Sequence, residues 1–218
     1  MVSERIGKCG VMPIVNTMDY KNAGLLAKAM TRAGMTVCEV VFRNDNAGQV
    51  LTEMISACPE MLIGAGTILT EEQVDTVKNI GAAFTVSPGL DRELTRYCLE
   101  KEILPIPGAT SASEVQLAVR LGLRTVKFFP AKQMGGLSTI DALAAPFPQV
   151  KYIPTNGVGF DNMEEYLKNP HILACGGTFP CPPDMIAAKD FDGISRLCEK
   201  ALNLVCRARE TVTEEERK

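Results

Sequence analysis

The sequence has no tryptophan, a single histidine and no apolar run near the roughly 20 residues that a membrane span requires. None of the eight cysteines is spaced C-x-x-C, and with one histidine this argues against a zinc site. A net charge of −3 excludes the strongly basic footprint of nucleic-acid-binding proteins. The first residues contain no signal-peptide core, so we expect a cytoplasmic protein with reduced thiols, no metal and no other cofactor.

The composition is that of an ordinary globular protein. Hydrophobic residues make up 46% of the 218 residues and charged residues 22%, which is enough to bury a core without disulfide or metal support. No low-complexity linker interrupts the chain, so residues 1–218 are predicted to form a single domain. Residues 211–218 are predicted to be a frayed, charged C-terminal tail.

Short β-prone segments alternate with helical segments along the chain. The predicted strands are residues 10–16, 36–43, 62–68, 83–87, 103–107, 125–129, 152–155 and 172–176. A short helix is expected before the first strand and a final helix within residues 190–208. Eight strictly alternating units favour a parallel (β/α)8 TIM barrel. An open doubly wound sheet is the alternative, although no G-x-G-x-x-G turn follows the first strand.

One lysine interrupts the apolar sixth strand. Lys127 lies within Thr125–Phe129, a segment typical of a strand buried on both faces. A buried ammonium is costly unless it is paired, reaches an edge of the sheet or gives up its charge. Lys127 is therefore either a structural lysine or a nucleophile that attacks a carbonyl group. Lys132, shortly after the strand, is interpreted as a surface lysine, with a place at the barrel mouth as the alternative.

The second predicted strand carries two charged residues, Glu39 and Arg43. Side chains alternate along a strand, so Glu39 and Arg43 share one face and are predicted to enter the barrel lumen with Lys127. Such a trio could be a buried ion cluster without chemistry, but three charges in one barrel are expensive as structure alone. As a reactive set, Lys127 would form a Schiff base with a ketone, Glu39 would move protons, and Arg43 would bind a carboxylate. A 2-keto acid carries both the ketone and the carboxylate.

Loops at the ends of other strands could complete a binding site. Gly64–Thr67 offers small residues that let a substrate approach the backbone, and the Thr67 hydroxyl could bind a carboxylate. Ser87–Gly89 is predicted to form a rigid wall after the fourth strand. Loops after the seventh and eighth strands are where barrels often bind phosphate. The candidate residues in those loops are Thr155, Asn156, Gly157, Gly177 and Thr178.

Taken together, these segments resemble the family of 2-keto-3-deoxy-6-phosphogluconate (KDPG) and 4-hydroxy-2-oxoglutarate (KHG) aldolases. The matching segments, in chain order, are Glu39–Arg43, Gly64–Thr67, Ser87–Gly89, Pro107–Thr110, Val126–Ala131, Pro154–Val158 and Gly176–Thr178. The resemblance implies a class I aldolase that cleaves a 2-keto-4-hydroxy acid to pyruvate and an aldehyde. It implies Lys127 as the Schiff-base lysine and Glu39 as the acid/base residue, with Arg43, Thr67 and Pro88 forming the pyruvate pocket. It also implies a homotrimer that uses no metal.

Two segments depart from the family pattern and leave the substrate open. Asn156 stands where the family usually has glycine, and Thr178-Phe179 stands where it usually has serine and tryptophan. Asn156 adds a side chain where a phosphate would lie, so a phosphate or a second carboxylate could be the distal group. A phosphate-binding barrel of the phosphosugar-isomerase type, without covalent lysine chemistry, is the alternative function.

Overall fold

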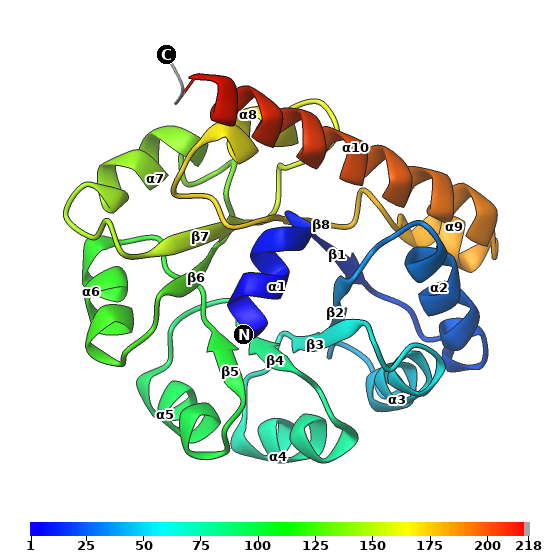
Figure 1. Ribbon diagram of the computed structural model, residues 1–218. Helices are drawn as coiled ribbons and strands as arrows, with labels where there is room; N and C mark the ends of the chain where they lie inside the picture. Colours follow the sequence, from blue (N-terminus) through cyan, green and yellow to red (C-terminus); the bar gives the residue numbers. More distant parts are fainter. Residues whose placement is uncertain (216–218) are drawn as a thin grey trace.

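In the computed structural model, which describes residues 1–215, eight parallel strands curl into a barrel (Figure 1). The strands are β1 Val11–Val15, β2 Val37–Val41, β3 Leu62–Gly66, β4 Phe84–Val86, β5 Leu104–Ile106, β6 Thr125–Phe128, β7 Lys151–Pro154 and β8 Cys175–Gly177. Six of them pair in the order β5-β4-β3-β2-β1-β8, and β6 pairs with β7. Single bridges join the two sheets at Gly108 with Lys127 and at Thr155 with Gly176, which closes the ring. The (β/α)8 barrel prediction is confirmed.

Helices surround the strands and cover their outer faces (Figure 1). They are α1 Val2–Cys9, α2 Tyr20–Arg32, α3 Ala47–Ala57, α4 Glu71–Ile80, α5 Arg92–Glu100, α6 Ala112–Arg120, α7 Gly136–Ala144, α8 Met163–Lys168, α9 Pro183–Ala187 and α10 Phe191–Glu215. Local sequence explains where several begin: Thr70 and Ser111 accept hydrogen bonds from the backbone N–H groups three residues later, which caps α4 and α6. The sequence did not predict α9.

The final helix is longer than the sequence suggested. It runs to Glu215, so residues 211–215 are helical, whereas a frayed tail was predicted from residue 211. The physical reason is that Thr211–Glu215 contains no glycine or proline that would stop a helix. The rest of the predicted tail, residues 216–218, lies outside the described residues.

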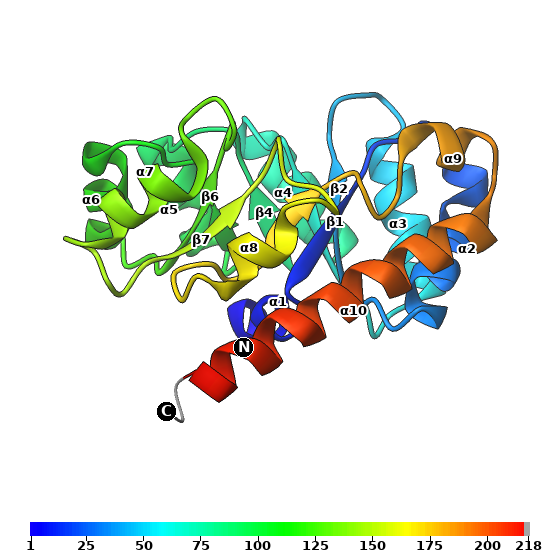
Figure 2. The same cartoon turned by 90° about the horizontal axis from the view of Figure 1, so that it is seen from above.

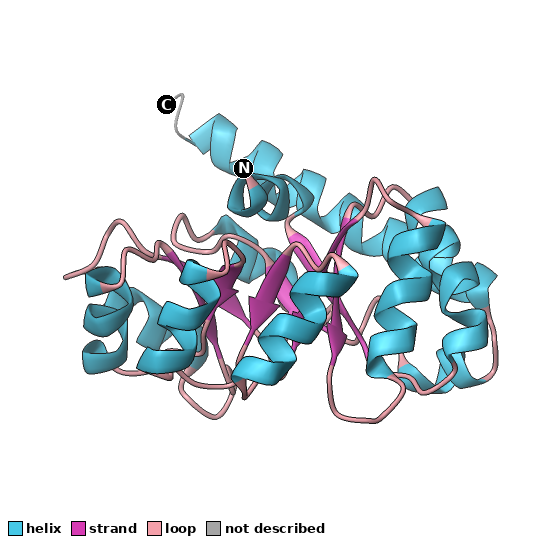
Figure 3. Ribbon diagram, turned by 90° about the horizontal axis from the view of Figure 1, so that it is seen from below, coloured by secondary structure: helices cyan, strands magenta, loops and turns pink. Residues whose placement is uncertain are grey.

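One end of the barrel is covered and the other is left to the loops. Helix α1 immediately precedes β1, and Figures 2 and 3 show it against the end of the barrel where the strands begin, next to α10. Ile6 of α1 is fully buried there, and Arg209 of α10 donates hydrogen bonds to the carbonyl oxygens of Gly7 and Lys8. The carboxyl ends of the strands, with the loops that follow them, therefore form the open face.

Seven of the eight cysteines are buried in the interior of the protein. All eight cysteines are free, and only Cys206 is exposed. Burial raises the pKa of several of the buried thiols, including Cys38, Cys98 and Cys175, which makes them poor nucleophiles. No helix within residues 1–215 combines the length and apolar character that crossing a bilayer would need.

Candidate active site

Lys127 lies inside the barrel, near the carboxyl end of β6. Its backbone N–H donates to the carbonyl oxygen of Pro107, and its own carbonyl accepts from the N–H of Ala109, both at 2.9 Å. The side chain is 5% exposed, so the amine is almost completely removed from solvent. Its Nζ lies 5.0 Å from the centre of the Phe129 ring, within the range of a cation–π contact. The strand and its neighbours hold this lysine in one place.

Glu39, in the middle of β2, faces Lys127 across the lumen. Its carboxyl is fully buried, and its Oε1 lies 3.9 Å from Lys127 Nζ, which is too far for a direct hydrogen bond. Within the described residues, neither carboxyl oxygen accepts a hydrogen bond from a protein group. A purely structural buried ion pair needs close geometry and additional hydrogen bonds, and this pair has neither. The arrangement favours a reactive pair over a structural one.

Burial raises the pKa of the Glu39 carboxyl above its usual range, and the nearby positive charges of Lys127 and Arg43 oppose this shift only in part. A carboxyl with a raised pKa holds its proton at a higher pH than an exposed one. This shift suits Glu39 to an acid/base role, in which it must both donate a proton and take it back.

Gly66 leaves the space that the Glu39 carboxyl occupies. A Cβ atom at Gly66 would lie 1.8 Å from Glu39 Oε1 and 2.5 Å from its carboxyl carbon. The sequence predicts that the small residues of this segment let a substrate approach the backbone. At Gly66 the close neighbour is instead the Glu39 side chain. Because Gly66 has no side chain, the carboxyl of Glu39, the candidate acid/base group, can occupy this space.

We expect Gly66→Ala to lower kcat by about 10²–10⁴, the usual worth of a positioned acid/base group, because the added methyl displaces the Glu39 carboxyl. Steady-state kinetics with the native and variant proteins measure the effect. Gly48→Ala, in α3, is the matched control, since among residues 1–215 a Cβ there would meet only Cδ1 of Ile80, at 3.7 Å. Wild-type kcat in Gly66→Ala would contradict the positioning role.

Arg43 lies at the rim of the barrel and not within the lumen. β2 ends at Val41, so Arg43 follows two residues beyond the strand and its side chain is exposed. The prediction that strand alternation would bury it with Glu39 and Lys127 is wrong for this reason. Its Nε donates to Thr67 Oγ1 at 3.0 Å, and its positive charge acts to lower the pKa of the Glu39 carboxyl, against the larger effect of burial. Arg43 and Thr67 together form a polar pair at the mouth.

The backbone of Thr67 is unusual. Its φ is +61°, a left-handed conformation that β-branched residues rarely adopt. Such a conformation persists only where the surrounding structure enforces it, and it is often found at functional sites. The turn after β3 therefore fixes the hydroxyl that Arg43 contacts.

Pro88 also lies at the rim, in the turn after β4. It lines a hollow of about 390 Å³ between the loops that follow β3 and β4, together with Ile68, Leu69, Ser87, Gly89, Leu90, Asp91, Leu94 and Glu114. A Cβ on Gly108 would lie 2.0 Å from the carbonyl oxygen of Pro88, so the turn packs closely against the end of β5. This contact supports the predicted rigid wall.

The loops after β7 and β8 meet at the opposite side of the mouth. Thr155 is buried, and its hydroxyl lies against Gly176, where a Cβ would approach Oγ1 to 2.5 Å. Asn156 and Gly157 are exposed and both have left-handed backbones, with φ of +72° and +84°. Thr178 is exposed after the buried Gly177. Within the described residues, the backbone N–H groups of Gly157 and Thr178 donate to no protein acceptor, whereas the N–H of Asn156 faces Gly176 in the bridge between Thr155 and Gly176. The N–H groups of Gly157 and Thr178 are available to an anion.

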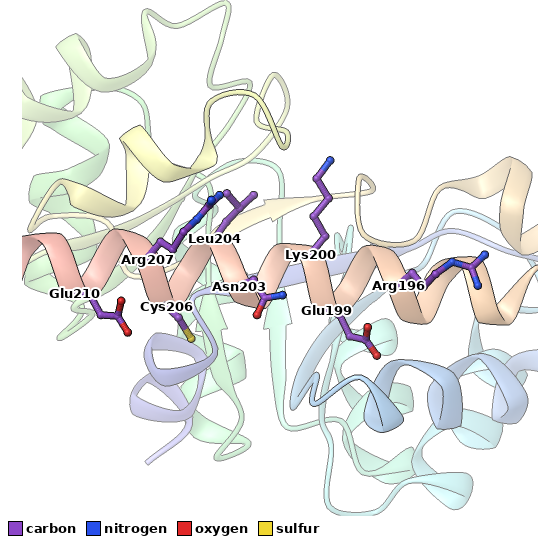
Figure 4. Close-up of a pocket in the computed structure, with 8 residues that line it drawn as sticks. All are labelled: Arg196, Glu199, Lys200, Asn203, Leu204, Cys206, Arg207 and Glu210. Carbon is purple, nitrogen blue, oxygen red and sulfur yellow. The ribbon is translucent and has the colours of Figure 1, made fainter.

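A larger hollow, of about 600 Å³, runs along the outer face of α10 (Figure 4). Two of its charged side chains contact neighbouring elements: Arg207 lies 3.5 Å from a carboxylate oxygen of Glu164, and Lys200 Nζ lies 4.4 Å from the centre of the Phe160 ring. Residues of both charge signs line it, and they are remote from Lys127. No group of three potential metal ligands occurs among residues 1–215. The barrel mouth is therefore the candidate site.

Two contacts within the site were not predicted from the sequence, one made by Phe129 and one made by Gly66. Phe129 lies two residues after Lys127, but the contact of its ring with the Lys127 amine was not predicted. Gly66 was noted as small, yet nothing in its neighbouring sequence points to Glu39, which is 27 positions away. Alternation within β6 could have signalled the first, because residues 127 and 129 share a face. The second depends on the register of β2 and β3, in which Val41 pairs with Gly66.

A parallel (β/α)8 barrel with a buried lysine, a buried carboxyl of raised pKa and an arginine at the mouth has the features of the barrel lyases that act on carbonyl compounds. A family model described as "KDPG and KHG aldolase" matches residues 2–197. A 2-dehydro-3-deoxy-phosphogluconate aldolase of Treponema pallidum is 37% identical over 204 residues, covering 94% of this chain and 97% of that protein. A KHG/KDPG aldolase of Escherichia coli K12 is 36% identical, covering 88% and 90%.

A solved structure gives the same result. The KDPG aldolase of Legionella pneumophila, with pyruvate captured as a covalent carbinolamine intermediate, has a TM-score of 0.89 and 35% identity, over 92% of this chain and 98% of that one. The chain therefore belongs to the KDPG and KHG aldolase family and is an aldolase, that is, an aldehyde-lyase. A thiamine phosphate pyrophosphorylase of Pyrococcus furiosus, at 12% identity, shares only the fold.

Proposed function

We propose that the protein cleaves a 2-keto-4-hydroxy acid with an anionic tail to pyruvate and an aldehyde, through a Schiff base on Lys127. The observation that carries the proposal is the buried pair of Lys127 Nζ and Glu39 Oε1, 3.9 Å apart. This gap leaves room for a proton to pass between the carboxyl and the groups attached to the amine. Arg43 and Thr67 would bind the substrate carboxylate at the rim, beside the wall that contains Pro88.

Each step assigns a proton to a group of this chain. The neutral Lys127 amine attacks the C2 ketone, and protonated Glu39 gives its proton to the departing hydroxyl, so that water leaves and an iminium forms. The Glu39 carboxylate then takes the proton of the C4 hydroxyl. The C3–C4 bond breaks, its electron pair enters the iminium to give an enamine, and the aldehyde leaves. Glu39 returns the proton to C3, and water releases pyruvate and the free lysine.

The distal end of the substrate would lie against the loops after β7 and β8. The free N–H groups of Gly157 and Thr178 are suited to an anion, and an uncharged tail that covered them would leave them without partners. A donor that a bound tail removes from water without replacing its hydrogen bond costs about 1–3 kcal/mol. We therefore propose that Thr155, Asn156, Gly157, Gly177 and Thr178 form the distal anion site, and we favour phosphate over a second carboxylate.

The test compares kcat/KM for three substrates: 2-keto-3-deoxy-6-phosphogluconate, its unphosphorylated form and 4-hydroxy-2-oxoglutarate. We expect both anionic tails to be preferred over the neutral one by about 5–150-fold, the range that 1–3 kcal/mol implies. Equal cleavage of the neutral-tailed substrate would overturn the distal anion site. If the dicarboxylate is preferred and Asn156→Gly restores use of the phosphorylated substrate, then Asn156 has redirected the site.

The homotrimer that the family resemblance implies and the cytoplasmic location expected from the sequence belong to the same proposal, as does a role in carbohydrate metabolism. Eight free thiols agree with a reducing compartment. Sedimentation analysis of the purified protein tests the trimer directly.

A further inference from the structure

Lys132 lies between the Schiff-base candidate and the distal loop. It follows Lys127 by five positions, just beyond the end of β6, and its side chain is exposed at the open face of the barrel. Its backbone N–H donates to the carbonyl oxygen of Asn156 at 3.1 Å, and the N–H of Ala131 donates to that of Thr155 at 2.9 Å. These two bonds continue the pairing of β6 with β7 past the strand ends. They fix the base of the Lys132 side chain to the distal loop.

The side chain of Lys132 lies across Gly157. A Cβ at Gly157 would be 2.3 Å from Cβ of Lys132, 3.3 Å from its Cγ and 3.2 Å from its Cδ. Cδ of Lys132 is no farther than its Cγ from the position that a Cβ of Gly157 would take. The side chain of Lys132 therefore follows the loop instead of extending straight away from it. Glycine at 157, with its φ of +84°, is what permits this close passage. The stem of Lys132, as far as Cδ, is thereby kept beside the distal loop.

The charge of Lys132 is not neutralised by the protein. Among residues 1–215 it forms no salt bridge. Other exposed lysines do have such partners: Lys8 pairs with Glu4, and Lys101 with Asp75. An uncompensated cation beside unpaired backbone donors is an electrostatic arrangement that attracts an anion.

We infer that Lys132 determines specificity for the substrate tail, by holding the distal anionic group over the loop that contains Asn156 and Gly157. The inference rests on the proposed function and adds a residue to its distal site. Lys132 forms no bond with reacting atoms, so it acts on substrate binding and leaves the chemical step at Lys127 to the buried pair. A phosphate dianion would gain more from this contact than a single carboxylate.

The experiment compares Lys132→Met and Lys132→Arg with the wild type on 2-keto-3-deoxy-6-phosphogluconate and on its unphosphorylated form. We expect Lys132→Met to lower the ratio of the two kcat/KM values about fivefold to tenfold, through KM for the phosphorylated substrate, because an exposed ion pair with a dianion is lost. Lys132→Arg keeps the charge and should keep the ratio within about twofold. Lys28→Met, on the exposed face of α2, is the matched control.

Salt gives a second readout that a purely structural role would not move. Raising the ionic strength from about 0.01 M to about 0.3 M should reduce the phosphate preference of the wild type, and should reduce that of Lys132→Met much less. An unaltered ratio in Lys132→Met, or an equal loss on both substrates, would overturn the inference. Trapping of pyruvate on Lys127 is measured in the same variant. If trapping persists while the ratio does not respond, only Lys132 is wrongly assigned, whereas absence of trapping in the wild type would reject the proposed function itself.

Discussion

Incubation of the protein with pyruvate and borohydride is expected to trap one pyruvyl adduct, on Lys127. The iminium between the Lys127 amine and the ketone of pyruvate is reduced by hydride to a stable secondary amine. Lys127 is favoured over the other lysines because its side chain is only 5% exposed and lies beside Glu39. The free amine is the nucleophilic form that attacks the ketone. Mass spectrometry of the digested protein locates the adduct.

Lys127→Ala should abolish both the adduct and turnover, because Lys127 is the only buried lysine among residues 1–210. The variant should still fold, since the change removes a buried charge and leaves the backbone bonds of β6 in place. Circular dichroism and thermal unfolding monitor this. Lys28→Met is the control that must retain both the adduct and turnover. An adduct on a different lysine would remove Lys127 from the mechanism.

Glu39→Gln should separate Schiff-base formation from proton transfer. Glutamine preserves the size of the side chain but cannot release or accept a proton at neutral pH. We expect borohydride still to trap some adduct, whereas exchange of the pyruvate methyl protons with solvent deuterium falls by about 10²–10⁴. Proton NMR measures this exchange without the need for a complete substrate. Exchange at the wild-type rate in this variant would exclude Glu39 as the proton shuttle.

The raised pKa of Glu39 also makes a prediction about pH. The folded-state pKa lies above the ordinary value of 4.5, so the stability that Glu39 contributes is fully present below that value and is lost as pH rises through the folded pKa. Glu39→Gln has no such titration. The free energy of unfolding of the wild type, relative to this variant, should therefore decrease as pH rises. Denaturant unfolding of both proteins across the pH range measures the difference, and a difference that does not depend on pH would contradict the raised pKa.

Much of the architecture could be predicted from local patterns. Strands that are hydrophobic throughout, separated by amphipathic helices at a regular period, can bury both faces of a parallel sheet in few other ways. Side-chain alternation along one strand is equally local, which is why Glu39 was correctly directed into the barrel. Burying a charged residue within an apolar strand costs free energy, and for this reason the sequence alone indicates Lys127 as a candidate nucleophile.

Contacts between distant segments could be decided only by the tertiary structure. The space for the Glu39 carboxyl depends on Gly66 across the β2–β3 register, and the course of Lys132 depends on Gly157 of another loop. The end of a strand decides whether alternation continues, and because β2 stops at Val41, Arg43 lies at the rim. Sequence patterns report what each residue does to its own segment. The juxtaposition of segments, which sets the distances on which chemistry depends, follows only when the barrel closes.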